Sequence, residues 1–543
     1  MKPARFAQTV SILMSVLALG ANAANPILPL WEYIPDGEPY VFEDPDNPGK
    51  MRVYLYGSHD TIRTAYCGLD YVAWSAPVED PGNWRFDGVA FRSDRNAKGA
   101  PLLKSAFGDF LWDPDVALVT GPDGKKTYYM FPFIQEGATR PVGLAARKRL
   151  GMVAKSSRPD GPFEVCNWSK DDPEKVSGIG QPLAVFVDDD GRAYAYWDGV
   201  GAELDTSTMA TLKPGAKVVR QVSSCWMKGA SRYFEGPSLR KIKGKYVFIY
   251  CRRTANGEWG LPSSPYTLAY AYSDHPLGPY TYGGTLIDCR GRETGPDGKT
   301  RVTAAPCGNT HGSLCEINGK WYLFYHRQTG TDEFSRQAMV AQVEISVDER
   351  PGGKVSIPEA EYNCLGFETE GLDPFESHAA GIACYYIGPT PATYKWPTCT
   401  YSGPYPEPFR CEAYGFGNDL IKSRNMNRCA LVHCTDGSVA GWKYFNFDKT
   451  FGKKGLKLLV ELEPIGVDGE VAVWVKRPSA REGGLKIGTF SVTSGLPDRI
   501  QTLEVSVDAL AGVKGREALY FTFSSPVKNR SICTLHTLQF SPQ

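Results

Sequence analysis

Residues 320–325 read Lys-Trp-Tyr-Leu-Phe-Tyr, and this pattern of a basic residue followed by a short aromatic strand occurs five times in the chain. The other four copies are residues 52–56, 126–130, 192–196 and 245–250. Their centres lie roughly 50 to 75 positions apart, which is about the length of one four-stranded propeller blade. The repeat therefore predicts a five-bladed β-propeller over residues 24–370.

The composition of the 543-residue chain agrees with an all-β protein of more than one domain. The chain holds 57 glycines and 40 prolines, and 12% of its residues are aromatic. Helical periodicity is nearly absent before residue 370, and such turn-rich chains are typical of β folds. The length exceeds the roughly 300 residues that one hydrophobic core covers, so we expect two domains.

The sequence changes character after Gly366. A proline-rich stretch is followed by short runs that alternate apolar and polar residues, which places one apolar face at a period of two. There are seven such runs, at residues 442–447, 456–462, 471–475, 485–490, 503–507, 519–523 and 535–540. Seven short strands at this spacing predict a β-sandwich, and we assign residues 371–543 to a linker and this second domain.

The first 23 residues have the pattern of an export signal. Lys2 and Arg5 precede an apolar run from Val10 to Leu19, and Ala21-Asn22-Ala23 follows as a cleavage site. We expect residues 1–23 to be removed and the protein to reach the periplasm or the extracellular space. No later run has the roughly 18 apolar residues of a membrane span, so we expect no span.

The charges balance, with 60 Lys and Arg against 60 Asp and Glu, and they form no basic block. This pattern does not favour nucleic acid as a partner, and a neutral chain suits a neutral substrate. We expect a monomer. The 14 cysteines match no disulfide scaffold or zinc pattern, although Cys429 and Cys434 could pair across neighbouring strands.

Four polar residues from four different repeats come shortly before strands, where the inner strands of a propeller converge on its axis. They are Asp36, Asp115, Glu235 and His311. Each alone is typical of a turn or a surface position, but four at equivalent places favour a functional site with two opposed carboxylates. The chain has no G-x-S-x-G or H-E-x-x-H motif for a serine hydrolase or a zinc peptidase.

Two facing carboxyl groups are what cleavage of a glycosidic bond requires. One protonates the leaving oxygen, and the second, if the pair stands about 6.5 to 9.5 Å apart, activates a water so that the anomeric configuration inverts. The acid must stay protonated near neutral pH, which burial or a neighbouring negative charge achieves.

The order of the motifs resembles glycoside hydrolase family 43. The segments are Pro-Asp36-Gly-Glu-Pro, Leu-Trp112-Asp-Pro-Asp115-Val, Phe-Glu235-Gly-Pro-Ser-Leu-Arg and His311-Gly-Ser-Leu, and they span about residues 35–345. Members of this family are five-bladed propellers that act on arabinose-, xylose- or galactose-containing polysaccharides. The resemblance implies that Asp36 is the general base, with Glu38 as the fallback, and that Glu235 is the general acid.

The same resemblance implies the rest of the predicted site. We expect substrate contacts from Trp112, Asp115, Gln181, His311 and Arg336. Catalysis should need no cofactor, and a structural calcium ion is possible. The predicted function is an inverting, exo-acting α-L-arabinofuranosidase or β-xylosidase with a plant-type polysaccharide or oligosaccharide as substrate.

One position departs from the family pattern. The family usually carries a third carboxylate in an Ile-Asp-Pro segment before the third inner strand, where it tunes the acid, but this chain has Gln181 there. A neutral amide cannot hold a proton on Glu235 by charge. Either Asp115 or another acid tunes Glu235, or the activity is altered or lost; the alternative function is then a non-catalytic polysaccharide-binding propeller protein.

The C-terminal strands resemble family 6-type carbohydrate-binding modules, mainly in the aromatic-rich residues 441–447 and 519–523. Such modules bind sugars through exposed aromatic faces and hydrogen bonds. The alternative is a domain that only packs against the propeller and stabilises it.

Overall fold

A computed structural model of the protein describes residues 24–61, 66–93, 110–135, 149–167, 184–197, 199–220, 233–264, 266–304, 309–329, 334–390, 393–395, 400–402, 407–408 and 429–542. These residues form β-strands, turns and short 3-10 helices, with no α-helix among them. In this part of the chain no helix has the length and apolar character needed to cross a membrane. The predicted export signal and Gln181 lie outside the described residues.

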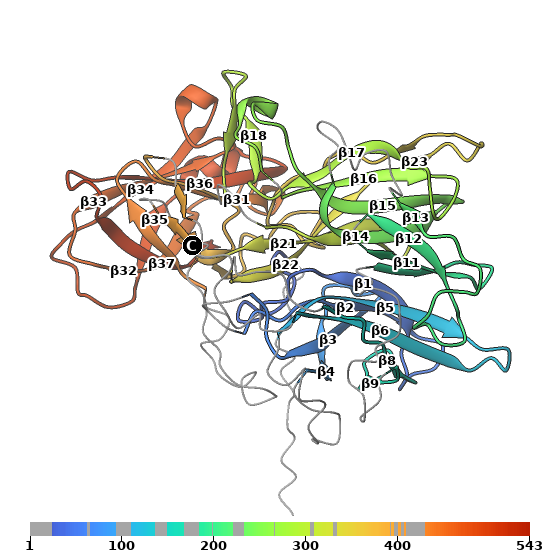
Figure 1. The fold of residues 1–543 in the computed structure, drawn as a ribbon. Coiled ribbons are helices and arrows are strands. Elements are labelled where there is room, and N and C mark those ends of the chain that lie inside the picture. The colour runs from blue at the N-terminus through green and yellow to red at the C-terminus, as the bar shows by residue number, and fades with distance from the viewer. Residues whose placement is uncertain are drawn as a thin grey trace, which may run out of the picture.

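Five antiparallel sheets follow one another along the chain as the blades of a propeller (Figure 1). Blade 1 has β1 (Glu38–Glu43), β2 (Met51–Tyr56), β3 (Asp70–Pro77) and β4 (Arg85–Arg92); blade 2 has β5 (Leu111–Thr120), β6 (Lys126–Gln135), β7 (Arg149–Leu150), β8 (Ala154–Ser156) and β9 (Glu164–Val165). Blade 3 has β10 (Ala184–Val187), β11 (Ala193–Trp197), β12 (Val200–Leu204) and β13 (Val219–Arg220). Blade 4 has β14 (Tyr233–Ile242), β15 (Lys245–Arg252), β16 (Thr267–Ser273) and β17 (Thr281–Asp288), and blade 5 has β20 (Gly312–Ile317), β21 (Lys320–Gln328) and β22 (Arg336–Val343).

The first strand of each blade is the inner one, and these strands close a ring. β1 contacts β5, β5 contacts β10, β10 contacts β14, β14 contacts β20, and β20 contacts β1 again. The three-stranded fifth blade is extended at its outer edge by the segment before β1. There the Ile27 N–H donates to the Ala338 carbonyl at 3.1 Å, and the Asn25 side chain bonds both the N–H and the carbonyl of Val340 at 2.8 Å. The predicted five-bladed propeller is confirmed.

The aromatic repeats are the second strands of the blades, not the inner strands that we expected. They lie in β2, β6, β11, β15 and β21, and every residue of β15 is buried. A second strand is covered on both faces by neighbouring blades, which explains a continuous apolar sequence rather than an alternating one. The polar residues of the predicted site therefore lie one strand earlier, where the inner strands begin.

Two facing sheets form the C-terminal sandwich, and all seven predicted strands are present. One sheet has the order β29 (Glu407–Pro408), β30 (Leu431–Thr435), β37 (Ser531–Ser541), β32 (Lys457–Pro464) and β35 (Gln501–Ser506), with β25 (His378–Ala379) paired to β37. The other has β26 (Tyr385–Ile387), β31 (Val439–Asn446), β36 (Arg516–Ser524), β33 (Gly469–Val475) and β34 (Leu485–Val492). Small hairpins are β18 (Arg292–Thr294) with β19 (Thr300–Val302), β23 (Ser346–Val347) with β24 (Val355–Ser356), and β27 (Thr393–Lys395) with β28 (Thr400–Ser402).

The expected pairing of Cys429 with Cys434 is wrong. Cys434 lies on β30 and faces Cys533 on β37, whereas Cys429 lies on the approach to the same strand β30 and packs against Gly381. Two residues of one extended segment cannot face each other, because a strand rises about 3.3 Å per residue. Cys434 and Cys533 are free thiols in the structure.

The sandwich and the last two blades share one hydrophobic core. Ile249 of β15 and Leu323 of β21 belong to the same buried cluster as Trp442 and Phe445 of β31. Polar contacts add to this junction: Arg301 of β19 donates two hydrogen bonds to Glu482 at 2.7 and 3.2 Å, and the buried Lys443 is ion-paired with Glu293 of β18. The two domains are therefore packed together as one body (Figure 1).

Candidate active site

Asp36 lies immediately before β1 and is 3% exposed. Its φ of 59° is in the left-handed region, which aspartate tolerates better than most residues. The Asp36 N–H donates to Nδ1 of His326 at 3.0 Å, and the Ser58 hydroxyl donates to Asp36 Oδ2 at 2.7 Å. These contacts fix the carboxylate in one orientation at the mouth of the inner ring.

Arg336, at the start of β22, holds Asp36 from the other side. Its Nη1 lies 3.1 Å from Asp36 Oδ2, while its Nε and Nη2 donate to the two oxygens of Asp60 at 2.8 Å each. The guanidinium also lies over the ring of Tyr66, 4.9 Å from its centroid. Because Arg336 is 2% exposed and fully engaged by carboxylates, it orients the predicted base; direct contact with substrate stays a prediction.

His326 completes this support as a neutral imidazole. Burial and the positive charges of Arg336 and His311 outweigh the attraction of Asp36, and they lower the pKa of His326 to about 3. Its Nδ1 therefore accepts the Asp36 N–H, and its Nε2 bonds Oδ1 of Asn309.

Glu235 lies near the start of β14, within a stretch where the pairing with β15 is irregular between Tyr233 and Ser238. Burial, followed by the negative charges of Asp113 and Asp36, raises the pKa of Glu235 to about 8, against the opposing charges of His311 and Arg336. The carboxyl group is therefore protonated at neutral pH, the state that a general acid needs.

His311 lies before β20 and connects the other groups. Its Nδ1 lies 3.2 Å from Oδ2 of Asp113 and 3.8 Å from Oδ1 of Asp36, and its Nε2 lies 3.9 Å from Oε1 of Glu38. Burial by itself lowers the pKa of His311, but the carboxylates of Asp113, Asp36 and Glu38 outweigh it and raise the pKa to about 10. His311 is thus an imidazolium at neutral pH, enclosed by carboxylates.

Asp115 and Glu38 are engaged in contacts between blades, although Glu38 also lies 3.9 Å from the His311 imidazole. Asp115 accepts hydrogen bonds from the Tyr40 hydroxyl at 2.5 Å and from the Val185 N–H at 2.6 Å. Glu38, on β1, is ion-paired with Arg240 at 2.9 Å. Both side chains are buried, and Asp115 has a partner in each neighbouring blade. The choice of Asp36 over the fallback Glu38 as base stays a prediction.

Trp112 belongs to an aromatic wall beside Arg336. Its ring centroid lies 5.6 Å from that of Tyr66, which in turn contacts Phe334 at 4.9 Å. Trp112 is half-buried, and its indole nitrogen is buried. Such a ring can cover the apolar face of a sugar.

One group of side chains in the described part of the chain could hold a metal ion: Asp36, Asp113 and His311 each bring a ligand atom within 4.8 Å of the others. Calcium takes six to eight oxygen ligands, but this group offers two carboxylates and a protonated imidazole, which has no free lone pair. The group therefore fits an ion pair better than calcium.

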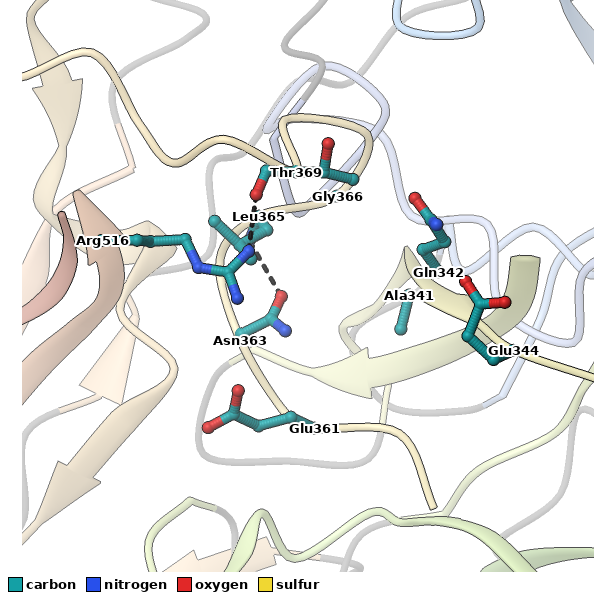
Figure 2. Close-up of a pocket in the computed structure, with 9 residues that line it drawn as sticks. All are labelled: Ala341, Gln342, Glu344, Glu361, Asn363, Leu365, Gly366, Thr369 and Arg516. Carbon is teal, nitrogen blue, oxygen red and sulfur yellow. Dashed lines mark hydrogen bonds between the residues drawn. The ribbon is translucent and has the colours of Figure 1, made fainter. Parts of the chain in front are cut away.

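A second hollow lies away from these residues, between blade 5 and the sandwich (Figure 2). This pocket of about 300 Å³ is lined by Ala341, Gln342, Glu344, Glu361, Asn363, Leu365, Gly366, Thr369 and Arg516. β22 starts at Arg336 and ends at Val343, so at about 3.3 Å per residue its two ends lie roughly 20 Å apart. The pocket is thus separate from the candidate site, and the Arg516 guanidinium in it donates to the Thr369 carbonyl at 2.5 Å.

Most aromatic residues in the two segments that resemble a carbohydrate-binding module are in the core. Trp442, Phe445, Phe447, Tyr520, Phe521 and Phe523 are all buried, and Tyr444 is half-buried. They pack against one another and against the propeller, so they cannot form a flat exposed platform for a glycan. Glycan binding by another surface of the sandwich stays a prediction.

Three functional side chains escaped the sequence analysis: Asp113, Asp60 and His326. Asp113 is two positions from the residue that we chose, Asp115, and Asp60 follows the first aromatic repeat in Tyr-Gly-Ser-His-Asp. His59, next to Asp60 in the sequence, bonds Asp70 at 2.8 Å and Glu32 at 3.0 Å.

The chain is similar in sequence to known glycoside hydrolases. The sequence model of the family described as Glycosyl hydrolases family 43 matches residues 78–351. A xylosidase/arabinosidase from Thermoclostridium stercorarium is 29% identical over 547 aligned residues, which cover 94% of this chain and 98% of that protein. Xylosidase/arabinosidase 43A from Humicola insolens is 27% identical, over 54% of this chain and 88% of its own length.

Among solved structures, one similar protein is a glycoside hydrolase family 43 arabinoxylan arabinofuranohydrolase from Bacillus subtilis, determined in complex with cellotetraose. It shares 18% identity, covers 96% of this chain and 98% of its own, and superposes with a TM-score of 0.44.

The contact of Arg336 with Asp36 and Asp60 gives a first prediction. Arg336→Lys keeps the charge but loses the planar fork that joins the two carboxylates. We expect kcat for glycoside hydrolysis to fall by about 10²-fold, because a displacement of about 1 Å at the reacting centre has that effect, while KM changes little. The matched control is Arg158→Lys, which breaks a similar fork with Asp46 and Asp160 at the surface. Equal kcat in both variants would contradict the positioning role.

Proposed function

The chain belongs to glycosyl hydrolases family 43, and we propose that it is an inverting, exo-acting glycosidase that releases arabinofuranosyl or xylosyl units from plant-type polysaccharides or oligosaccharides. One observation carries this proposal. Asp36 and the Glu235 turn both lie beside the His311 imidazolium, but Asp36 is paired with a further cation and Glu235 is paired with no cation that the structure describes. Asp36 is ion-paired with Arg336 at 3.1 Å, whereas no ion pair among the described residues includes Glu235. The relatives named xylosidase/arabinosidase support the choice of sugar.

In the proposed reaction, Glu235 gives its proton to the glycosidic oxygen while a water attacks the anomeric carbon. Asp36 takes a proton from that water, so the C–O bond to the leaving group breaks as the new C–O bond forms on the opposite face. Ser58 and Arg336 keep the Asp36 carboxylate oriented throughout. The products are a free sugar of inverted configuration and a shortened glycan.

The surroundings of the pair support this division of roles. A base must be charged and an acid must be protonated at the same pH, so their environments have to differ. Asp36 is held by the guanidinium of Arg336, whereas burial with neighbouring negative charge favours the neutral form of Glu235. This difference also weakens the non-catalytic alternative, since the glutamine at 181 does not leave Glu235 without a nearby carboxylate.

We keep the predictions that residues 1–23 direct export to the periplasm or the extracellular space and that the protein works as a monomer. The sequence pattern at the N-terminus supports the first. The mass of the mature chain and its elution volume in size-exclusion chromatography check both.

The substrate class is tested with aryl α-L-arabinofuranoside, aryl β-D-xyloside and aryl β-D-galactoside, together with arabinoxylan and xylo-oligosaccharides. We expect turnover of the arabinofuranoside or the xyloside and release of monosaccharide from chain ends or branches. Proton NMR of the first sugar released should show the anomer opposite to that of the substrate. Calorimetric binding of these glycans with no hydrolysis would overturn the proposal.

The roles of the two carboxyl groups are tested by Glu235→Gln and Asp36→Asn. Glu235→Gln should lose about 10²- to 10⁴-fold activity on natural oligosaccharides and much less on a dinitrophenyl glycoside, whose leaving group needs no proton. Asp36→Asn should lose activity on both substrates. In the wild type, activity should fall as pH rises through about 8, because Glu235 then loses its proton. Full activity of both variants would rule out these roles.

We also propose that catalysis needs no metal cofactor, since the positive charges beside the carboxylates come from Arg336 and His311. Treatment with EDTA should leave kcat unchanged. A structural calcium ion elsewhere would appear as a rise in the melting temperature when CaCl₂ is restored. Loss of kcat on chelation, with recovery on addition of calcium, would contradict the proposal.

A further inference from the structure

We propose that Asp113, from blade 2, is the third carboxylate of the site and holds the proton on Glu235, in place of the charge that Gln181 cannot supply. The proposal rests on the proposed role of Glu235 as general acid. It makes Asp113 a positioning residue that acts through the acid and not a group that touches the reacting atoms.

The backbone explains why Asp113 reaches the axis. In a regular strand, Asp113 and Asp115 would point to the same face, since side chains alternate. The pairing of β5 with β6 shifts between Trp112 and Asp115, which is a β-bulge at Pro114. Past the bulge Asp115 faces Tyr40 and Val185, whereas Asp113 faces His311. Bulges redirect single side chains in this way beside active sites.

The geometry brings Asp113 close to the predicted base and to the imidazole against which the Glu235 turn packs. Its carboxylate shares one cluster with Asp36 and His311, with ligand atoms within 4.8 Å of one another. On the side of the acid, the backbone next to Glu235 packs directly on the same imidazole: a Cβ on Gly236 would lie 2.9 Å from Cδ2 of His311. His311 therefore lies between the Glu235 turn and Asp113.

Asp113 carries a negative charge at neutral pH. Burial alone would raise its pKa, but the imidazolium of His311 beside it outweighs burial and lowers the pKa below the ordinary value. Of the charged groups that act on Glu235, Asp113 has the largest influence, ahead of His311, Asp36 and Arg336. The Cys251 thiol of β15 also interacts with Glu235, but its pKa is well above the ordinary value, so it is neutral.

The other acids near the axis do not fit this role. Asp115 is the alternative that the sequence suggested, but both of its oxygens bond groups of the neighbouring blades, and it is most strongly coupled to Glu38. Glu38 is held by Arg240 and by the Ser238 hydroxyl. Asp60 is neutralised by Arg336 through two hydrogen bonds. Asp113 differs from these acids because its cation, His311, itself packs against the Glu235 turn, and because no other charge acts on Glu235 as strongly.

The test compares Asp113→Asn and Asp113→Glu with the wild type. Asparagine keeps the shape and can still accept a hydrogen bond from His311, but it has no charge. We expect the alkaline limb of the pH profile of kcat/KM in Asp113→Asn to move to a pH lower by about 1, because the negative charge that acts most strongly on Glu235 is lost. Asp113→Glu restores the charge and should return the limb toward its wild-type position. Asp115→Asn is the control from the same strand; it should leave the limb in place even where it lowers the melting temperature.

A second measurement does not depend on activity. ¹³C NMR of protein labelled at glutamate carboxyl groups, with the Glu235 signal assigned by its absence in Glu235→Gln, gives the titration of the acid directly. A lower midpoint in Asp113→Asn supports the proposal, even if no glycoside is turned over and the proposed function fails. An unchanged midpoint and an unchanged limb in Asp113→Asn would overturn the proposal. An equal shift of the alkaline limb of the pH profile in Asp115→Asn would overturn the proposal as well.

Discussion

The compensation of buried negative charge at the ring axis is the constraint on which this site depends. Closing five inner strands brings several carboxylates into a dry interior, where an unpaired charge costs several kcal/mol. Most of these carboxylates are paired with a cation: Arg336 pairs with Asp60 and Asp36, Arg240 with Glu38, and His311 with Asp113. Asp115 instead accepts hydrogen bonds from Tyr40 and Val185. Among the described ion pairs Glu235 has none, so it meets the same constraint by keeping its proton. The positions of the cations thus determine which carboxyl group stays protonated and can act as the acid.

Irregular backbone at the strand starts makes this charge arrangement possible. A regular inner strand would alternate its side chains between two blades and present little to the axis. Here Asp36 adopts a left-handed conformation, β5 bulges after Trp112, and β14 is irregular around Glu235. Gly236, at φ +65°, lets the backbone approach the His311 ring closely. The regular parts of these strands form the packed core, whereas the irregular residues at their starts hold the side chains of the candidate active site.

The sequence allowed the architecture to be predicted more fully than the site. Five aromatic repeats and seven alternating runs give the propeller and the sandwich because periodicity reflects burial directly. The same logic misassigned the repeats as inner strands, because any strand that is covered on both faces has a continuous apolar sequence, whether it is the first or the second strand of its blade. Asp113 was missed because alternation predicts that it shares a face with Asp115, and a bulge breaks that rule. The support of Asp36 by Arg336 joins residues 300 positions apart, which no local pattern contains.

The second domain is best understood through the core that it shares with the propeller. A module attached only for binding would keep its own closed core and an exposed aromatic face. Here the aromatic residues of β31 and β36 are buried, and Trp442 donates from its indole nitrogen to the Ala380 carbonyl at 3.0 Å. Blades 4 and 5 contribute to the same cluster, and β22 of blade 5 begins at Arg336. The sandwich therefore packs against blade 5, which contains Arg336. This packing helps to keep Arg336 in position against Asp36.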